Sequence, residues 1–126
     1  MKKETLLLAV EGRLGLLLSV LYINIRTITP GNCYYGFTWH DKFEHFFAFA
    51  VLALLLDFSF PRSSFNLLKV AVLVLYGAGI EVVQLFVAFR DCDPFDFTAD
   101  LLGITLYFFS IPFLKLVPVI KSRWEE

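Results

Sequence analysis

The residues best suited to chemistry lie where a charged stretch of the chain gives way to an apolar segment. Asp93, Asp96, Asp100 and Gly103 follow one another at spacings of three, four and three residues. If a helix begins at Pro94 with Asp93 as its N-cap, these four residues share one face of that helix. Capping and the helix dipole account for Asp93 and Asp96, but Asp100 lies about two turns beyond the cap. This deeper acid predicts a partner on another helix.

Glu81 is a second acid in apolar surroundings. It lies in the middle of residues 67–89, where insertion scales assign a cost of about 2.5 to 3.5 kcal/mol to such a charged residue. Gly77, Glu81 and Gln84 are spaced by four and three residues, so they share a helix face, and the glycine allows another helix to approach closely. An acid on this stripe indicates a functional site. The competing interpretation is a structural hydrogen bond between helices from a neutral Glu81.

A third polar pair begins another apolar segment. Asp41 and His45 are four residues apart, so both can point into a helix bundle from one helix face. In the competing interpretation Asp41 is the N-cap of this helix, and Glu44 completes a capping box three residues later. The first interpretation brings this pair together with Glu81 and Asp100 in one pocket.

Histidine nitrogens and carboxylate oxygens are ligands for divalent cations and acid or base groups for hydrolysis and transfer. The candidates for catalysis are His45, Asp41, Glu81, Asp96 and Asp100; those for a divalent cation as cofactor are His45, Glu81, Asp96 and Asp100; those for ligand binding are Lys42, Gln84, Arg90 and Asp93. If Glu81 and Asp100 meet, they either share a proton or bind a cation. Arg90 is expected to pair with a nearby aspartate or with an anionic lipid head group. The sequence contains no Gly-rich phosphate loop, serine nucleophile elbow or CxxC site.

The composition indicates an integral membrane protein. Of the 126 residues 58% are hydrophobic and 17% are aromatic, and the mean hydropathy of +0.70 is far above that of ordinary soluble domains. The net charge of -1 gives no sign of nucleic acid as a partner, which leaves membrane lipid as the expected one. Without linkers, internal repeats or low-complexity tracts, residues 1–126 are expected to form a single domain.

Four apolar segments predict an all-α fold, a polytopic bundle of four transmembrane helices. The segments are residues 6–25, 43–60, 67–89 and 94–119, and each approaches or exceeds the roughly 20 residues that cross a bilayer. Lys2 and Lys3 before the first segment resemble the start of a signal peptide. Because no small-residue cleavage site follows, we expect this segment to be a retained first span.

An even number of spans puts both termini on the same side of the membrane. Most basic residues fall on that side: Lys2, Lys3, Arg62, Lys69, Lys115, Lys121 and Arg123, against Arg26, Lys42 and Arg90 on the other. By the positive-inside rule both termini are cytoplasmic, and the polar pocket opens to the outer face. Cys33 and Cys92 fall in the two outward loops, where an oxidising compartment would allow them to form a disulfide.

The polar motifs resemble those of the VanZ-like membrane proteins. The similarity rests on Asp41-Lys42-x-x-His45, Glu81-x-x-Gln84, Arg90, Asp93, Asp96 and Gly103 in this order and spacing, within residues 41–103 or about half of the chain. The chain departs from the family pattern at Asp100, where the family usually has asparagine. The resemblance implies a multi-pass protein of the bacterial cytoplasmic (inner) membrane, in a family whose namesake is linked to low-level teicoplanin resistance.

Three functions fit these observations. The first is a membrane factor that binds or acts on a cell-envelope precursor or lipid head group and so changes susceptibility to glycopeptides. The second is a membrane enzyme that uses a metal ion or acid–base groups on a lipid-linked phosphate, with Arg90 on the phosphate. The third is an assembly protein whose buried polar groups only fix the register of its helices.

Overall fold

The computed structural model describes residues 2–29, 39–87 and 94–125, and the secondary structure of these residues is entirely helical. Four α-helices, α1 (Lys3–Ile28), α2 (Trp39–Ser59), α3 (Leu67–Gln84) and α4 (Pro94–Leu114), are followed by a short 3-10 helix, η1 (Lys121–Trp124). The prediction of an all-α fold with four long helices is therefore confirmed.

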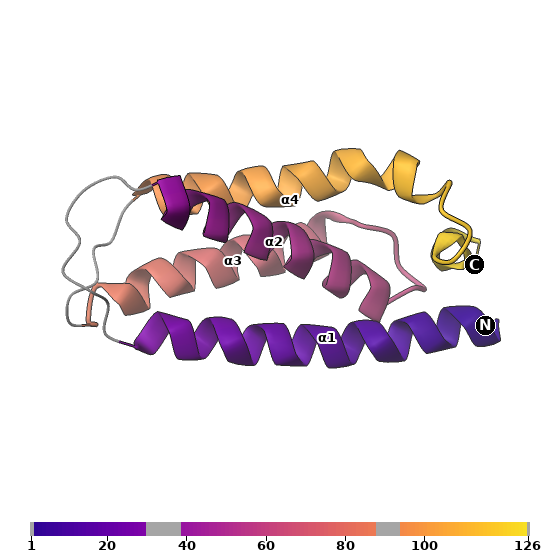
Figure 1. Ribbon diagram of the computed structural model, residues 1–126, viewed down its shortest axis with the longest axis horizontal. Helices are drawn as coiled ribbons and strands as arrows, with labels where there is room; N and C mark the ends of the chain where they lie inside the picture. The colour runs from indigo at the N-terminus through magenta and orange to yellow at the C-terminus, as the bar shows by residue number, and fades with distance from the viewer. Residues whose placement is uncertain (1, 30–38, 88–93, 126) are drawn as a thin grey trace.

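The four helices run alternately up and down in one bundle (Figure 1). α1 and α3 end where α2 and α4 begin; we call this the loop end of the bundle, and the opposite end the terminal end. Both termini lie at the terminal end (Figure 1), where Lys2 Nζ is 3.2 Å from Glu125 Oε2. The most extensive contact is between α2 and α4, and α1 packs against α2 and α3.

The apolar core lies between the polar ends of the bundle. Its buried side chains come from α2, α3 and α4: Phe49, Leu52, Ala53, Leu56, Leu73, Ile80, Ile104 and Tyr107. Burying such side chains contributes about 1.5 to 3 kcal/mol each in water, although contact between helices inside a bilayer relies more on packing and on interhelical hydrogen bonds. The core therefore fixes how the polar residues at both ends are placed.

A glycine explains why α2 and α4 approach so closely. A Cβ added to Gly103 would lie 2.2 Å from the carbonyl oxygen of Phe46 and 2.9 Å from the backbone nitrogen of Ala50. Both are backbone atoms of α2, so no side-chain movement could make room. Gly103 thus belongs to the face predicted for α4, and its role is to allow backbone contact.

The helix bounds differ from the apolar segments of the sequence. α1 extends three residues beyond both predicted ends, and α2 begins at Trp39 rather than residue 43. α3 ends at Gln84 rather than residue 89, since the amide of Leu85 turns back to the carbonyl of Val82 at 3.2 Å in a tighter turn. α4 ends at Leu114 rather than residue 119, two residues after Pro112, which has no amide hydrogen to donate.

Three of the described helices are long and apolar enough to cross a membrane: α1, α3 and residues Phe95–Leu114 of α4. Their outer surfaces carry exposed large apolar side chains such as Leu17 on α1, Leu75 on α3 and Phe113 on α4, each at least 66% exposed. α2 differs because it carries charged residues near both of its ends, among them Lys42 and Asp57. These charges are buried within the bundle, so they form its two polar centres.

Candidate functional site

A cluster of buried polar side chains lies at the loop end of the bundle. We call it the polar cluster; it consists of Lys42 and His45 from α2, Glu81 and Gln84 from α3, and Asp96 and Asp100 from α4. Asp96 and Asp100 reach it because they share one face of α4 with Gly103. Glu81 and Gln84 reach it because they share one face of α3 with Gly77. The helix periodicity of the two stripes therefore accounts for four members of the cluster.

Lys42 and Asp96 form a short, buried ion pair in the cluster. Lys42 Nζ donates a hydrogen bond to Asp96 Oδ1 at 2.6 Å, and the two side chains are only 11% and 10% exposed. A close, largely desolvated pair of this kind links α2 to α4 and loses much stability if one partner is removed. The sequence predicted Lys42 only as a ligand-binding residue. In the structure its side chain also joins two helices of the polar cluster.

His45 lies between the two aspartates of α4. Its Nδ1 is 2.8 Å from Asp100 Oδ1, and its Nε2 is 3.7 Å from Asp96 Oδ2. The hydrogen bond to Asp100 fixes the orientation of the imidazole ring. This arrangement gives His45 an oriented nitrogen on the side of Asp96, which suits either a metal ligand or a general acid or base.

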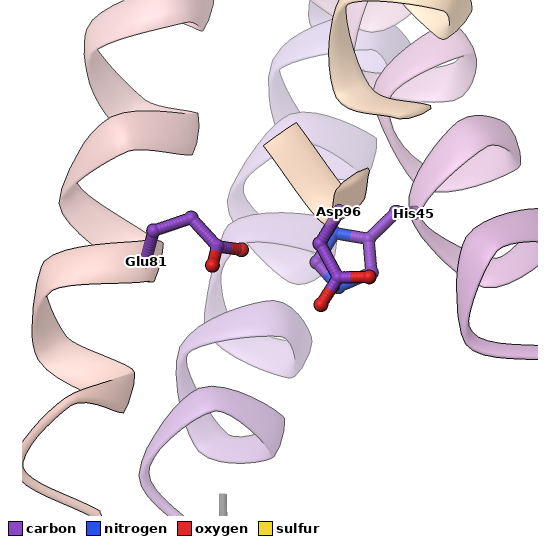
Figure 2. A group of neighbouring side chains, drawn as sticks. All are labelled: His45, Glu81 and Asp96. Carbon is purple, nitrogen blue, oxygen red and sulfur yellow. The ribbon is translucent and has the colours of Figure 1, made fainter. Parts of the chain in front are cut away.

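Glu81 completes a group that has the donor chemistry of a cation site. Figure 2 shows Glu81 extending from α3 toward His45 and Asp96. One ligand atom from each of these three residues lies within 4.8 Å of the other two, so a single ion could contact all three. Nitrogen and carboxylate oxygen donors of this kind suit Zn²⁺, Mn²⁺ and related divalent cations. Asp100 is not one of these three residues; it contacts the Nδ1 atom of His45.

Two further oxygens of the cluster are buried without a hydrogen bond to any described residue. They are Gln84 Oε1 and Asp100 Oδ2, on side chains that are 5% and 1% exposed. Asp100 Oδ2 faces α3, since a Cβ added to Gly77 would lie 3.0 Å from it. Buried oxygens normally have a partner, so these two atoms indicate a bound water, proton or ion.

Asp41 is not among the buried residues of the polar cluster, and its predicted place in one pocket with His45 stays a prediction. α2 begins two residues before Asp41, which is therefore in the first turn and exposed. Because α2 already includes Trp39 and His40, Asp41 is not its N-cap, and the competing prediction of a capping box with Glu44 is wrong. An acid in the first turn still interacts favourably with the positive end of the helix dipole.

Four other predicted residues lie outside the residues that the structure describes. These are Arg90 and Asp93, expected to bind a ligand or cap α4, and Cys33 and Cys92, the expected disulfide. Their pairing and roles stay predictions.

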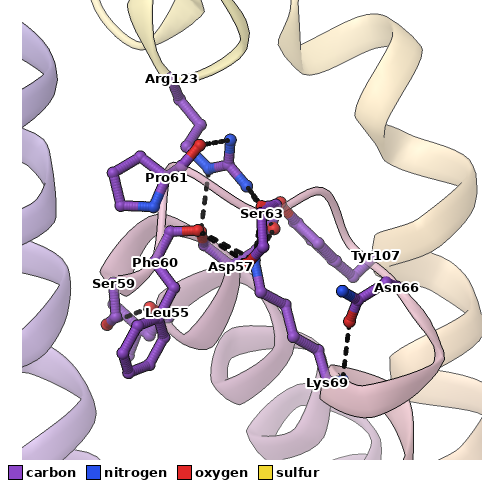
Figure 3. A network of polar contacts seen from close by, with 10 residues as sticks. All are labelled: Leu55, Asp57, Ser59, Phe60, Pro61, Ser63, Asn66, Lys69, Tyr107 and Arg123. Atoms are coloured by element: carbon purple, nitrogen blue, oxygen red, sulfur yellow. Dashed lines mark hydrogen bonds and ion pairs between the residues drawn. The ribbon is translucent and has the colours of Figure 1, made fainter. Parts of the chain in front are cut away.

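A second polar network, at the terminal end, has no counterpart in the sequence predictions (Figure 3). Asp57 is fully buried and accepts hydrogen bonds from Lys69 Nζ at 2.8 Å, Arg123 Nη2 at 2.6 Å and the Tyr107 hydroxyl at 2.5 Å. We call these four residues the Asp57 network. A lone acid at Asp57 and a lone lysine at Lys69, each within an apolar segment, were signals that could have revealed it. Arg123 carried no such signal because it lies in η1, beyond the last long helix.

The network also holds the connection between α2 and α3. Lys69 Nζ donates to the carbonyl oxygens of Phe60 and Ser63, and the Arg123 guanidinium donates to those of Pro61 and Ser63. All three carbonyls therefore face inward onto cations. Lys69 and Arg123 thus bind both the Asp57 carboxylate and the carbonyls of this connection. We therefore assign the network a structural role, which is to hold the connection between α2 and α3 against the bundle.

Comparison with known proteins gives a partial match. A protein of the yeast Schizosaccharomyces pombe, described only as uncharacterized, is 39% identical over 70 residues, which are 53% of this chain and 43% of the yeast protein. The matched part is thus less than half of that relative. No family model matches the chain, and no solved structure matches it. The resemblance to VanZ-like proteins stays a prediction.

Proposed function

We propose that this chain is a VanZ-like multi-pass membrane protein whose polar cluster binds a divalent cation and, through it, the phosphate of a lipid head group or lipid-linked envelope precursor. The observation that carries the proposal is the convergence of His45, Glu81 and Asp96, with one ligand atom of each within 4.8 Å of the others. Divalent cations held by a few protein ligands keep positions for further oxygens, and phosphate is a common occupant.

Electrostatics favours a cation as the link to phosphate. The described side chains of the polar cluster include three carboxyl groups, Glu81, Asp96 and Asp100, against the cations Lys42 and, when protonated, His45. Carboxylates in low dielectric repel a phosphate directly, whereas a divalent ion between them attracts it. The buried Asp100 Oδ2, which has no described partner and belongs to a side chain in contact with His45, supports the same conclusion, because a water bound to the ion would satisfy it.

The membrane placement that we propose is four spans with both termini in the cytoplasm. α2 would be the fourth span, since its charged side chains Lys42 and Asp57 are buried in the bundle and not exposed to lipid. The basic residues concentrated at the terminal end favour a cytoplasmic position for it. The polar cluster would then lie toward the outer face, where envelope precursors are used.

The narrower form of the proposal concerns a bacterial inner membrane and glycopeptides. It rests on the VanZ-like pattern of residues 41–103. Deleting the gene in a bacterial host should change the teicoplanin concentration that stops growth, and restoring the gene should reverse the change. If the restored strain behaves like the deletion strain, this narrower form is wrong and only the lipid or precursor proposal is left.

A second candidate is an enzyme that cleaves or transfers a lipid-linked phosphate. It is favoured by the contact of His45 Nδ1 with Asp100 Oδ1, which orients the ring as in histidine–carboxylate pairs that act in general acid–base catalysis. The test is release of inorganic phosphate from a polyprenyl diphosphate. His45→Ala should abolish the release, and His40→Ala, on the same helix but exposed, should leave it unchanged.

Binding is tested with purified protein in detergent and polyprenyl phosphate as the probe, with Mn²⁺ or with EDTA. The proposal predicts retention of the lipid only when Mn²⁺ is present, and its loss in His45→Ala but not in His40→Ala. Equal retention with Mn²⁺ and with EDTA would overturn the role of the ion. No retention under either condition, with the protein folded, would leave the assembly role as the explanation of the cluster.

A further inference from the structure

A half-open groove lies at the terminal end of the bundle, far from the polar cluster. It has a volume of about 470 Å³ and is lined by Leu6, Arg13, Phe60, Pro61, Arg62 and Ser63. This volume falls within the roughly 300 to 1,000 Å³ of small-molecule sites. We propose that the groove binds the phosphate head group of an anionic phospholipid in the leaflet at this end. The proposal uses other residues than the proposed function and is independent of it.

Arg13 is held in place for such a role. Its Nε donates to the carbonyl oxygen of Ser59 at 3.0 Å, and its guanidinium carbon lies 5.7 Å from the centre of the Phe60 ring. Neither terminal nitrogen of Arg13 makes a hydrogen bond to a described residue. An arginine that is already oriented loses little entropy when its remaining two nitrogens bind a phosphate.

The wall of the groove is fixed by the Asp57 network. Phe60, Pro61 and Ser63 line the groove, and none of them has a charged side chain. Their carbonyl oxygens point inward and accept hydrogen bonds from Lys69 or Arg123. The acceptor oxygens that would repel an anion are therefore occupied. The wall is also held rigid by hydrogen bonds that are buried or partly buried.

The charge around the groove is positive. The single carboxylate of Asp57 faces the two cations Lys69 and Arg123, and Arg13 and Arg62 in the groove add two more positive charges. Arg62 is exposed and forms no hydrogen bond or ion pair within the described part of the chain. These four cations and one carboxylate leave an excess of positive charge around the groove, which favours the binding of an anion.

Apolar lining and position favour a membrane lipid as the source of this anion. Leu6 and Phe60 are both 49% exposed beside the arginines, and α1, which carries Leu6, is long and apolar enough to cross a membrane. A lipid whose phosphate binds the arginines could therefore place its acyl chains against these apolar side chains. Basic pockets between membrane helices bind anionic head groups in this way.

The experiment is native mass spectrometry of the full chain in detergent, titrated with phosphatidylglycerol or phosphatidylcholine. We expect phosphatidylglycerol to bind more tightly, and Arg62→Gln to weaken it about five-fold, the effect of one basic residue near a membrane surface. Arg62→Gln combined with Arg13→Gln should weaken it further. Binding of phosphatidylcholine should not change in either variant.

Two matched substitutions serve as controls. Arg26→Gln removes an exposed arginine at the loop end, and Lys115→Gln removes an exposed cation at the terminal end outside the groove. Both should keep wild-type affinity for phosphatidylglycerol. Arg13 donates a hydrogen bond to the Ser59 carbonyl, so Arg13→Gln can destabilise the protein. If it does, the single variant Arg62→Gln is the test of lipid binding.

Three results would overturn the proposal. The first is equal binding of the two lipids, and the second is an equal loss in Lys115→Gln and Arg62→Gln, which would mean a general effect of charge. The third is full displacement of phosphatidylglycerol by millimolar inorganic phosphate, which would mean a site for free phosphate. Failure of cation binding at the polar cluster would leave all three readouts unchanged.

Discussion

Gly103→Ala tests whether the approach of α2 and α4 builds the polar cluster. The added Cβ would lie 2.2 Å from the Phe46 carbonyl oxygen, about 1.2 Å short of the 3.4 Å at which ordinary contact begins. If the helices separate by that amount, the distance from His45 Nδ1 to Asp100 Oδ1 grows from 2.8 Å to about 4.0 Å, beyond hydrogen-bond range. The clash and the lost hydrogen bond should together cost about 3 to 5 kcal/mol.

The assay is thermal unfolding of purified protein in detergent, followed by tryptophan fluorescence. A loss of about 3 to 5 kcal/mol should lower the melting temperature by roughly 10 to 20 °C. Gly79→Ala is the matched control, because a Cβ there would have none of the described atoms within 4 Å. We expect it to leave the melting temperature unchanged or slightly higher, since alanine is the better helix former. Equal melting temperatures for the two variants would refute this account of Gly103.

The remaining predictions concern single buried groups and use the same unfolding assay. Asp57→Asn leaves two buried cations without their counter-ion and should cost about 3 to 5 kcal/mol, whereas Glu11→Gln, at an exposed position on α1, should change little; equal effects would contradict the Asp57 network. Tyr107→Phe removes one hydrogen bond to that carboxylate and should cost about 1.5 to 3 kcal/mol, against no change for Tyr22→Phe, which is 60% exposed in the wild type. Glu81→Gln should keep the melting temperature measured in EDTA but lose the rise produced by Mn²⁺; a large loss in EDTA would favour the assembly role.

Helix periodicity predicted much of the polar cluster. Asp96, Asp100 and Gly103 lie on one face of α4, and Glu81 and Gln84 on one face of α3, because residues three and four apart are neighbours on any α-helix. The cost of an acid in an apolar segment then indicated that these faces point inward. This reasoning needs only local spacing, which the sequence contains.

The errors arose where the result depends on helix ends or on distant pairing. Asp41 was misplaced because α2 begins before its apolar stretch, so a shift of the helix start moved the residue from cap to exposed first turn. The Asp57 network was missed because its pairs join residues 12, 50 and 66 positions apart. Spacing within one helix does not reveal which helices meet or where η1 returns to the bundle.

The central claim is that His45, Glu81 and Asp96 hold one divalent cation. The most direct measurement is titration of the purified full chain with Mn²⁺, with free and bound ion separated by electron paramagnetic resonance. The account predicts one bound ion per chain in the wild type and in Glu11→Gln, an exposed acid on α1, and none in Glu81→Gln. Absence of binding in the folded wild type, or the same stoichiometry in all three proteins, would contradict it.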